Sequence, residues 1–182
     1  MGIQFIFVVE TNKKCNSDWI YIKETVDQFY SYEQTKTKFT PIYMDGKGNY
    51  MKKLKEIETK KRQFRAASKS NQSRVIYCFD CDEFDRKSED LKFLSEARKF
   101  CKKEGYEFVW FCKDIEHVYI GKRIEDSQKK KEAANFKARK LISKIDRKRL
   151  SEYDYKVERS NILEVLDRYP ELIRRDERSR NR

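Results

Sequence analysis

The chain has 182 residues, of which 41% are charged and 38% hydrophobic, a composition typical of one globular domain and not of a disordered or fibrous protein. No apolar run approaches the roughly 18 residues of a membrane span, and the short apolar segment at the start lacks the basic flank of a secretory signal, so we expect a cytoplasmic protein. The formal net charge of +12 favours an anionic partner, with nucleic acid as the first candidate.

The first part of the chain alternates apolar runs with helical patterns. Ile3–Val9 is an almost uninterrupted apolar run that predicts a strand buried on both faces, and Glu10 follows it directly. A helix is predicted from Ser17, where polar residues precede apolar residues at helical spacing. A short edge strand over 39–44 and a basic helix over 51–64 are expected next.

The most informative stretch is VIYCFDCDEFD, residues 75–85. Its apolar part predicts another strand buried on both faces, and Asp80 and Asp82 lie at its carboxyl end. If the chain stays extended there, the two side chains project to the same side about 7 Å apart, and such a pair of carboxylates suits Mg²⁺ or Mn²⁺. The alternative is that these acids are solvated caps of the next helix and stabilise its dipole.

The remaining elements complete an alternating pattern. A helix that ends at Gly105 and a strand over 106–112 are predicted. Together, the elements indicate an α/β fold with a doubly wound, mostly parallel sheet of about four strands, followed by basic C-terminal helices. We expect the α/β domain to span 1–125, a basic helical extension to pack on it over 126–173, and a disordered tail over 174–182.

The extension is strongly basic between Ser127 and about Tyr155. A solvated helical face and a surface that follows nucleic-acid phosphates both fit this pattern. A last helix, interrupted at Pro170, is predicted over 161–173. The predicted apolar face of the basic segment consists of Ala134, Ala138, Leu141 and Ile145.

The order of the strands decides whether the acids meet. In a doubly wound sheet, ligands bind outside the carboxyl ends of the strands, at the point where the strand order reverses. If the strands over 3–9 and 75–79 are neighbours there, Glu10 meets Asp80 and Asp82. Three carboxylates around one crevice repel each other strongly unless a cation lies among them. The sequence therefore predicts a metal site at this edge.

This pattern resembles the Toprim family, the catalytic domain of topoisomerases, bacterial primases and a group of nucleases that includes the overcoming-lysogenization-defect type. The resemblance lies in a glutamate after the first strand, FVVE with Glu10, and an aspartate pair after a later one, FDCDEFD with Asp80 and Asp82, and it covers roughly 3–120. Thr11 stands where the family usually has glycine. No tyrosine-nucleophile domain or primase zinc module is evident, so the nuclease branch is the better match.

The resemblance implies a phosphoryl-transfer site that depends on Mg²⁺ or Mn²⁺. Asp80 and Asp82 would hold the metal, and Glu10 would complete its coordination or take the proton from an attacking water. Glu116 is a candidate ligand for a second metal ion, and its alternative is an ordinary acid at the start of a helix.

Three further residues are candidates for supporting roles. His117 is a candidate for proton transfer, with a core or hydrogen-bonding role as its alternative. Lys113 or Lys122 would neutralise the charge that builds on the phosphate in the transition state. The main hypothesis is therefore a metal-dependent endonuclease that cleaves phosphodiester bonds of DNA or RNA, tRNA included.

The resemblance also suggests a biological setting and leaves an alternative open. The segment over 114–120 is similar to one in small Toprim proteins of bacterial anti-phage defence, which work beside a separate ABC-type ATPase. The alternative function is a non-catalytic nucleic-acid-binding module or a receiver-like module on the same α/β frame. Receiver domains have a pair of acids near the first strand, where this chain offers only Glu10.

Overall fold

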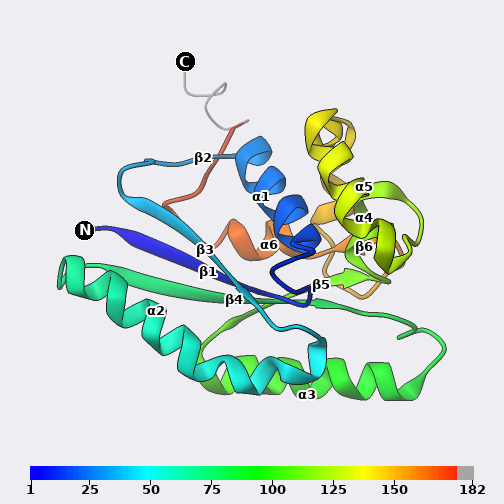
Figure 1. Ribbon diagram of the computed structural model, residues 1–182, viewed down its shortest axis with the longest axis horizontal. Helices are drawn as coiled ribbons and strands as arrows, with labels where there is room; N and C mark the ends of the chain where they lie inside the picture. The colour runs from blue at the N-terminus through cyan, green and yellow to red at the C-terminus, as the bar shows by residue number, and fades with distance from the viewer. Residues whose placement is uncertain (176–182) are drawn as a thin grey trace.

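Five strands form the main sheet in the computed structural model, which describes residues 1–175 (Figure 1). Their order is β3–β1–β4–β5–β6, and all neighbours are parallel except β6, which runs antiparallel to β5. The predicted α/β class and mostly parallel sheet are confirmed, but β6 was not expected because two residues form no recognisable pattern. The strands are β1 Ile3–Val9, β3 Thr37–Tyr43, β4 Gln72–Asp80, β5 Glu107–Cys112 and β6 Arg159–Ser160.

Helices cover both faces of this sheet and give the fold three layers. One face carries α1, α4, α5 and α6, and the other carries α2 and α3 (Figure 1). Three 3₁₀ helices, η1 to η3, connect these elements. The bounds are α1 Ser17–Phe29, η1 Lys47–Lys53, α2 Leu54–Ala67, α3 Ser88–Glu104, α4 Ile115–Ile120, α5 Asp126–Ala138, η2 Leu141–Lys144, η3 Arg147–Leu150 and α6 Ile162–Leu166.

The two hydrophobic cores follow from the alternation of side chains along the strands. On β1, Phe5 and Phe7 contribute to the core under α1, whereas Ile6 and Val8 contribute to the core under α2 and α3. The side chains of β4 divide in the same way, and both strands are buried on both faces as the sequence predicted. This burial fixes the strand register, because a shift by one residue would exchange the two faces.

The apolar face predicted for the basic segment is correct only in part, because Leu141 and Ile145 pack against the core whereas the two predicted alanines do not. Ala133 and Phe136 are the buried residues of α5, and Ala134 and Ala138 are exposed. The helix ends at Ala138, and Lys140 then has a left-handed backbone with φ of 51°. The helical spacing does not continue across this break, so counting back along one helix from the later apolar residues placed the buried side of α5 in the wrong phase.

The C-terminal segment belongs to the sheet more closely than predicted. This segment provides β6, and the side chain of Asn161 continues the hydrogen bonding along β5. Asn161 Oδ1 accepts a hydrogen bond from Trp110 N at 2.9 Å, and Asn161 Nδ2 donates one to Phe108 O at 3.0 Å. The helix expected over 161–173 is confined to the five residues of α6.

A second, two-stranded sheet corrects the start of the predicted tail. It pairs β2 Tyr30–Ser31 with β7 Ile173–Arg174 in antiparallel orientation. Arg174 also forms an ion pair with Asp167 at 2.6 Å, so residue 174 lies in an ordered strand. Residue 175 is also described, and residues 176–182 of that predicted segment lie outside the described residues. Within residues 1–175, no helix is both long and apolar enough to cross a membrane.

Candidate functional site

The strand order reverses between β1 and β4, which is where a doubly wound sheet binds its ligands. Glu10 follows β1, and Asp80 ends β4 on the neighbouring strand. Glu10 Oε1 accepts a hydrogen bond from Asp80 N at 2.9 Å. The predicted meeting of these two residues is therefore confirmed.

Burial and mutual repulsion make both carboxyls reluctant to ionise. Burial raises the pKa of Glu10 above its ordinary value, and the charges of Asp18 and Asp82 raise it further. Burial also raises the pKa of Asp80 strongly, and Glu10 adds to this rise. The side chain of Asp80 is fixed by α4, because its Oδ1 accepts a hydrogen bond from Ile115 N at 3.0 Å.

Asp82 departs from the predicted geometry. Its backbone φ is 49°, a left-handed conformation, so the chain is not extended between Asp80 and Asp82. The Asp82 side chain instead forms an ion pair with Lys47 in η1. Lys47 also pairs with Asp90 of α3 at 3.0 Å. The start of η1, where the glycines at 46 and 48 are typical of a turn, thus supplies a cation to the site.

Asp18 is a site residue that the sequence did not reveal. It is only 5% exposed, and its Oδ2 accepts a hydrogen bond from Thr11 N at 3.0 Å. Burial raises the pKa of Asp18. Its charge acts on both Glu10 and Asp80. The sequence signal was ambiguous, because an acid after a serine at a helix start is also an ordinary capping pattern.

Glu116 lies in α4 and faces the same cluster. The residue is fully buried, and neither side-chain oxygen has a hydrogen-bond partner within the described chain. Burial raises its pKa to about 7, although Lys129 of α5 opposes this rise. The Lys129 ammonium lies 3.6 Å from Glu116 Oε2. Glu116 is therefore a buried acid beside the site and not a solvated acid at a helix start.

Lys129 is the second cation that the structure brings to the acids. Burial by itself would lower its pKa, but the charges of Glu116 and Asp80 outweigh burial and raise it. The neighbouring acids therefore keep Lys129 positively charged. In the sequence this lysine is one of a run of three, and nothing in that run distinguishes the residue that turns inward.

The other predicted residues have different surroundings. His117 Nδ1 lies 2.8 Å from Asp114 Oδ1, which also accepts the His117 backbone N–H at 2.8 Å as the cap of α4. Lys113 pairs with Glu83 at 3.2 Å. Lys122 is exposed and does not line the pocket described below.

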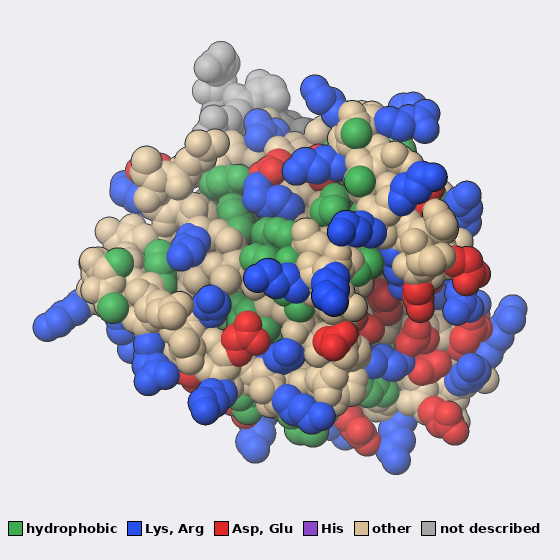
Figure 2. All heavy atoms as spheres, viewed as in Figure 1, with side chains coloured by type: hydrophobic (Ala, Val, Ile, Leu, Met, Phe, Trp, Pro, Cys, Tyr) green, Lys and Arg blue, Asp and Glu red, His purple; other side chains and the backbone are tan. Residues whose placement is uncertain are grey.

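A pocket of about 390 Å³ opens beside Asp80 and Asp82, and its lining does not include the buried acids Glu10, Asp18 and Glu116. Figure 2 shows acidic side chains gathered directly beneath α5, with lysines and arginines around them. The basic residues in its lining can neutralise a bound anion, and the acids can hold a cation. Its lining includes Asp80, Asp82, Glu83, Asp90, Lys113, Asp114, His117, Arg123, Asp126 and Lys129.

The donor set fits a hard divalent cation in its chemistry, since it consists of carboxylate oxygens. In the described residues 1–175, no group of three or more Asp, Glu, His or Cys side chains is arranged so that it could hold a metal ion. The ion pair with Lys47 explains part of this, because it engages Asp82. Glu10 and Asp80 would hold a metal ion together with Asp82 only after Asp82 leaves Lys47.

Comparisons with protein-family models, curated proteins and solved structures gave no match to this chain. The geometry of the site is therefore the basis for a functional conclusion.

Proposed function

We propose that the protein is an endonuclease that depends on Mg²⁺ or Mn²⁺ and hydrolyses phosphodiester bonds of DNA or RNA. The observation that carries this proposal is the gathering of Glu10, Asp18, Asp80 and Glu116 at the strand-order reversal, each with a raised pKa. Burying several carboxylates together is unfavourable by itself, and a divalent cation would compensate for it.

The residues take the following roles in this proposal. Glu10, Asp80 and Asp82 hold the metal, and Glu116 supports a second position beside it. When bound, the ion polarises a phosphate and stabilises charge on the leaving oxygen. Glu10 accepts a proton from the attacking water, for which a raised pKa is suitable. Lys129 replaces Lys113 and Lys122 as the better-placed cation, because it lies beside Glu116 in the acidic cluster. Lys113 also lines the pocket but pairs with Glu83, and Lys122 lies outside the lining.

A wider biological role rests on the Toprim resemblance alone. On that basis we include in the proposal an effector function in anti-phage defence, controlled by a separate ABC-type ATPase. The cytoplasm is the compartment that such a function requires. A cleavage experiment with purified protein tests the chemistry independently of this setting.

The test measures cutting of plasmid DNA and of total cellular RNA, tRNA included, with Mg²⁺, Mn²⁺ or EDTA. Glu10→Gln and Asp80→Asn preserve the size of each side chain, and Glu96→Gln on the exposed face of α3 is the matched control. We expect metal-dependent cutting by wild type and the control, and its loss in both site variants. If wild type does not cut, calorimetry with Mn²⁺ decides. A binding signal lost in Asp80→Asn supports the metal site, and no signal in any protein contradicts it.

One observation favours the alternative of a non-catalytic module. Lys47 already neutralises Asp82, so part of the acidic site is stable without a metal. That alternative predicts no metal-dependent cutting and unchanged nucleic-acid binding in Glu10→Gln.

A further inference from the structure

Much of the net positive charge of the protein is concentrated in one segment. Between residues 129 and 149 the sequence has ten Lys and Arg and two Asp and Glu, in a chain whose net charge is +12. These residues form most of α5, all of η2 and most of η3. We call the exposed side of residues 129–149 the basic face.

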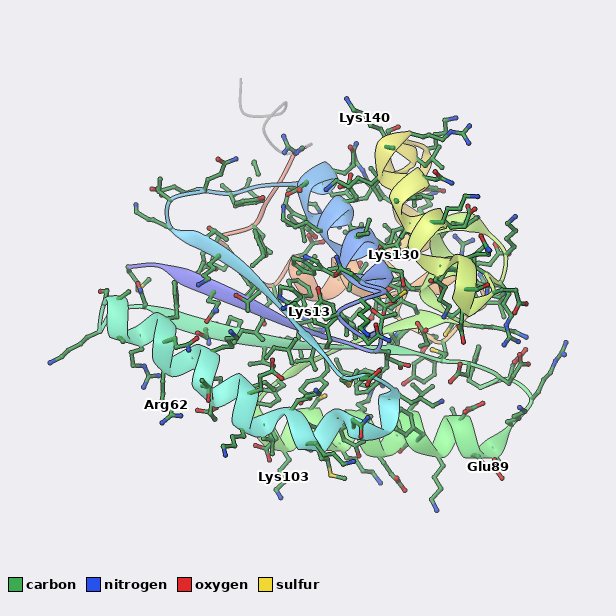
Figure 3. The ribbon with its side chains drawn as sticks, in the orientation of Figure 1. Lys13, Arg62, Glu89, Lys103, Lys130 and Lys140 are labelled. Atoms are coloured by element: carbon green, nitrogen blue, oxygen red, sulfur yellow. The ribbon has the colours of Figure 1, made fainter. Side chains whose placement is uncertain are left out.

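The charges of the basic face are available to an external partner. Six of its side chains are exposed and form no ion pair with another residue of the described chain. By contrast, α2 pairs Lys61 with Glu58 at 2.7 Å, and its Glu56 pairs with Lys53 at the end of η1 at 3.9 Å. Figure 3 shows Lys140 beyond the end of α5 with its side chain pointing away from the body of the protein. The six residues are Lys130, Lys131, Arg139, Lys140, Lys144 and Lys148.

The basic face is held firmly against the body of the protein. Phe136 of α5 is buried, and its ring lies 5.0 Å from that of Tyr21 and 5.7 Å from that of Tyr119, both centroid to centroid. The ion pair between Lys129 and Glu116 fixes the start of the same helix. A rigid array of cations binds a polyanion with less loss of conformational entropy than a flexible one.

The same helix begins at the candidate site. Asp126 and Lys129 line the pocket together with Asp80 and Asp82. Figure 2 shows basic side chains over α5 directly above the acidic group. An α-helix of 13 residues is roughly 20 Å long, and one strand of a duplex carries a phosphate about every 3.4 Å of helix axis. The basic face is therefore long enough for several consecutive phosphates.

We infer that the basic face binds the phosphate backbone of nucleic acid and leads the strand into the carboxylate pocket. Only the second half of this inference rests on the proposed nuclease function, because the binding requires neither metal nor cleavage. Nucleic acid is favoured over an anionic membrane because the apolar side of α5, Ala133 and Phe136, is buried in the protein. A membrane-binding helix needs that side free for insertion.

The test is fluorescence anisotropy in EDTA, where no metal-dependent cutting occurs, with labelled single-stranded DNA, single-stranded RNA and duplex DNA over a series of NaCl concentrations. The test variant is the triple substitution Lys130→Gln, Lys131→Gln and Lys144→Gln. The matched control removes three charges from the exposed face of α2, which lies on the other side of the sheet: Lys55→Gln, Arg62→Gln and Arg65→Gln. A separate binding measurement uses vesicles that contain phosphatidylserine.

The salt dependence gives the expected magnitude. Each lost phosphate contact reduces the slope of log K against log salt by about 0.9 for duplex DNA and about 0.7 for a single strand, so the test variant should lose roughly 2 to 3 units of slope. The control variant should keep the wild-type slope. The inference is overturned if both triple variants lose the same affinity, if wild type binds no nucleic acid, or if it binds only vesicles.

A further variant separates this inference from the proposed function. Asp80→Asn should bind nucleic acid as well as wild type in EDTA, because asparagine keeps the size of the side chain and the basic face is unchanged. Binding that depends on the basic face, with neither cleavage nor Mn²⁺ binding in calorimetry, would leave the binding half of this inference standing and contradict the nuclease proposal. Cleavage that continues unchanged in the Lys130 triple variant would contradict the claim that the basic face leads the strand to the pocket.

Discussion

Replacing Glu116 by glutamine should stabilise the protein above neutral pH. Glu116 is fully buried, and burial raises its pKa from 4.5 to about 7. Between these two pH values the folded protein holds a proton that the unfolded chain has released, so the free energy of unfolding falls as pH rises. The raised pKa of Glu116 lowers the free energy of unfolding by roughly 3 kcal/mol at pH 8, and this effect vanishes below about pH 4.

The Glu116→Gln variant should lack this loss of stability at higher pH. Glutamine has nearly the same shape and does not ionise, and Lys129 keeps a partner in Asp126, whose Oδ1 lies at 3.4 Å. At pH 4, wild type and Glu116→Gln should have similar free energies of unfolding. At pH 8, the variant should be more stable by about 2 to 3 kcal/mol, which is about 4 to 12 °C in melting temperature for a chain of this size.

The assay is urea unfolding followed by circular dichroism at half-unit steps from pH 4 to pH 8. Other buried acids also titrate in this range, so the difference between wild type and Glu116→Gln isolates the contribution of Glu116. Glu96→Gln, on the exposed face of α3, is the control and should follow wild type throughout. Parallel curves for wild type and Glu116→Gln would refute the assignment of Glu116 as a buried acid with a raised pKa.

Three further substitutions test other parts of the structure. Lys47→Met should raise the affinity for Mn²⁺ severalfold in calorimetry because it frees Asp82, and an unchanged affinity would show that Lys47 does not compete with the metal. Asn161→Ala removes two hydrogen bonds to the backbone of β5 and should lower the free energy of unfolding by about 2 kcal/mol, whereas a loss below 0.5 kcal/mol in urea unfolding would contradict that role. Phe136→Ala should destabilise by about 3 to 5 kcal/mol, and a thermal melt unchanged from wild type would mean that α5 is not anchored by this ring.

The strands and the meeting of Glu10 with Asp80 were predictable because both depend on local patterns and one topological rule. An apolar run marks each buried strand, and the reversal of strand order brings the two carboxyl ends together. The position of Asp82 was not predictable in the same way. Its left-handed backbone turns the side chain toward Lys47, and no pattern in FDCDEFD distinguishes that conformation from an extended one.

The positive charges that compensate the acids come from segments whose local sequence patterns indicate other roles. Lys47 lies at the start of η1 between two glycines, a pattern typical of a turn, and Lys129 belongs to a run of lysines typical of a solvated helical face. Asp18 occupies a position where an acid normally stabilises the start of a helix. Each local interpretation is physically reasonable, and only the packing of α1, η1 and α5 around the ends of β1 and β4 gives these side chains a second role. Sequence patterns thus locate the centre of the site, whereas its counter-charges depend on tertiary contacts between elements far apart in the chain.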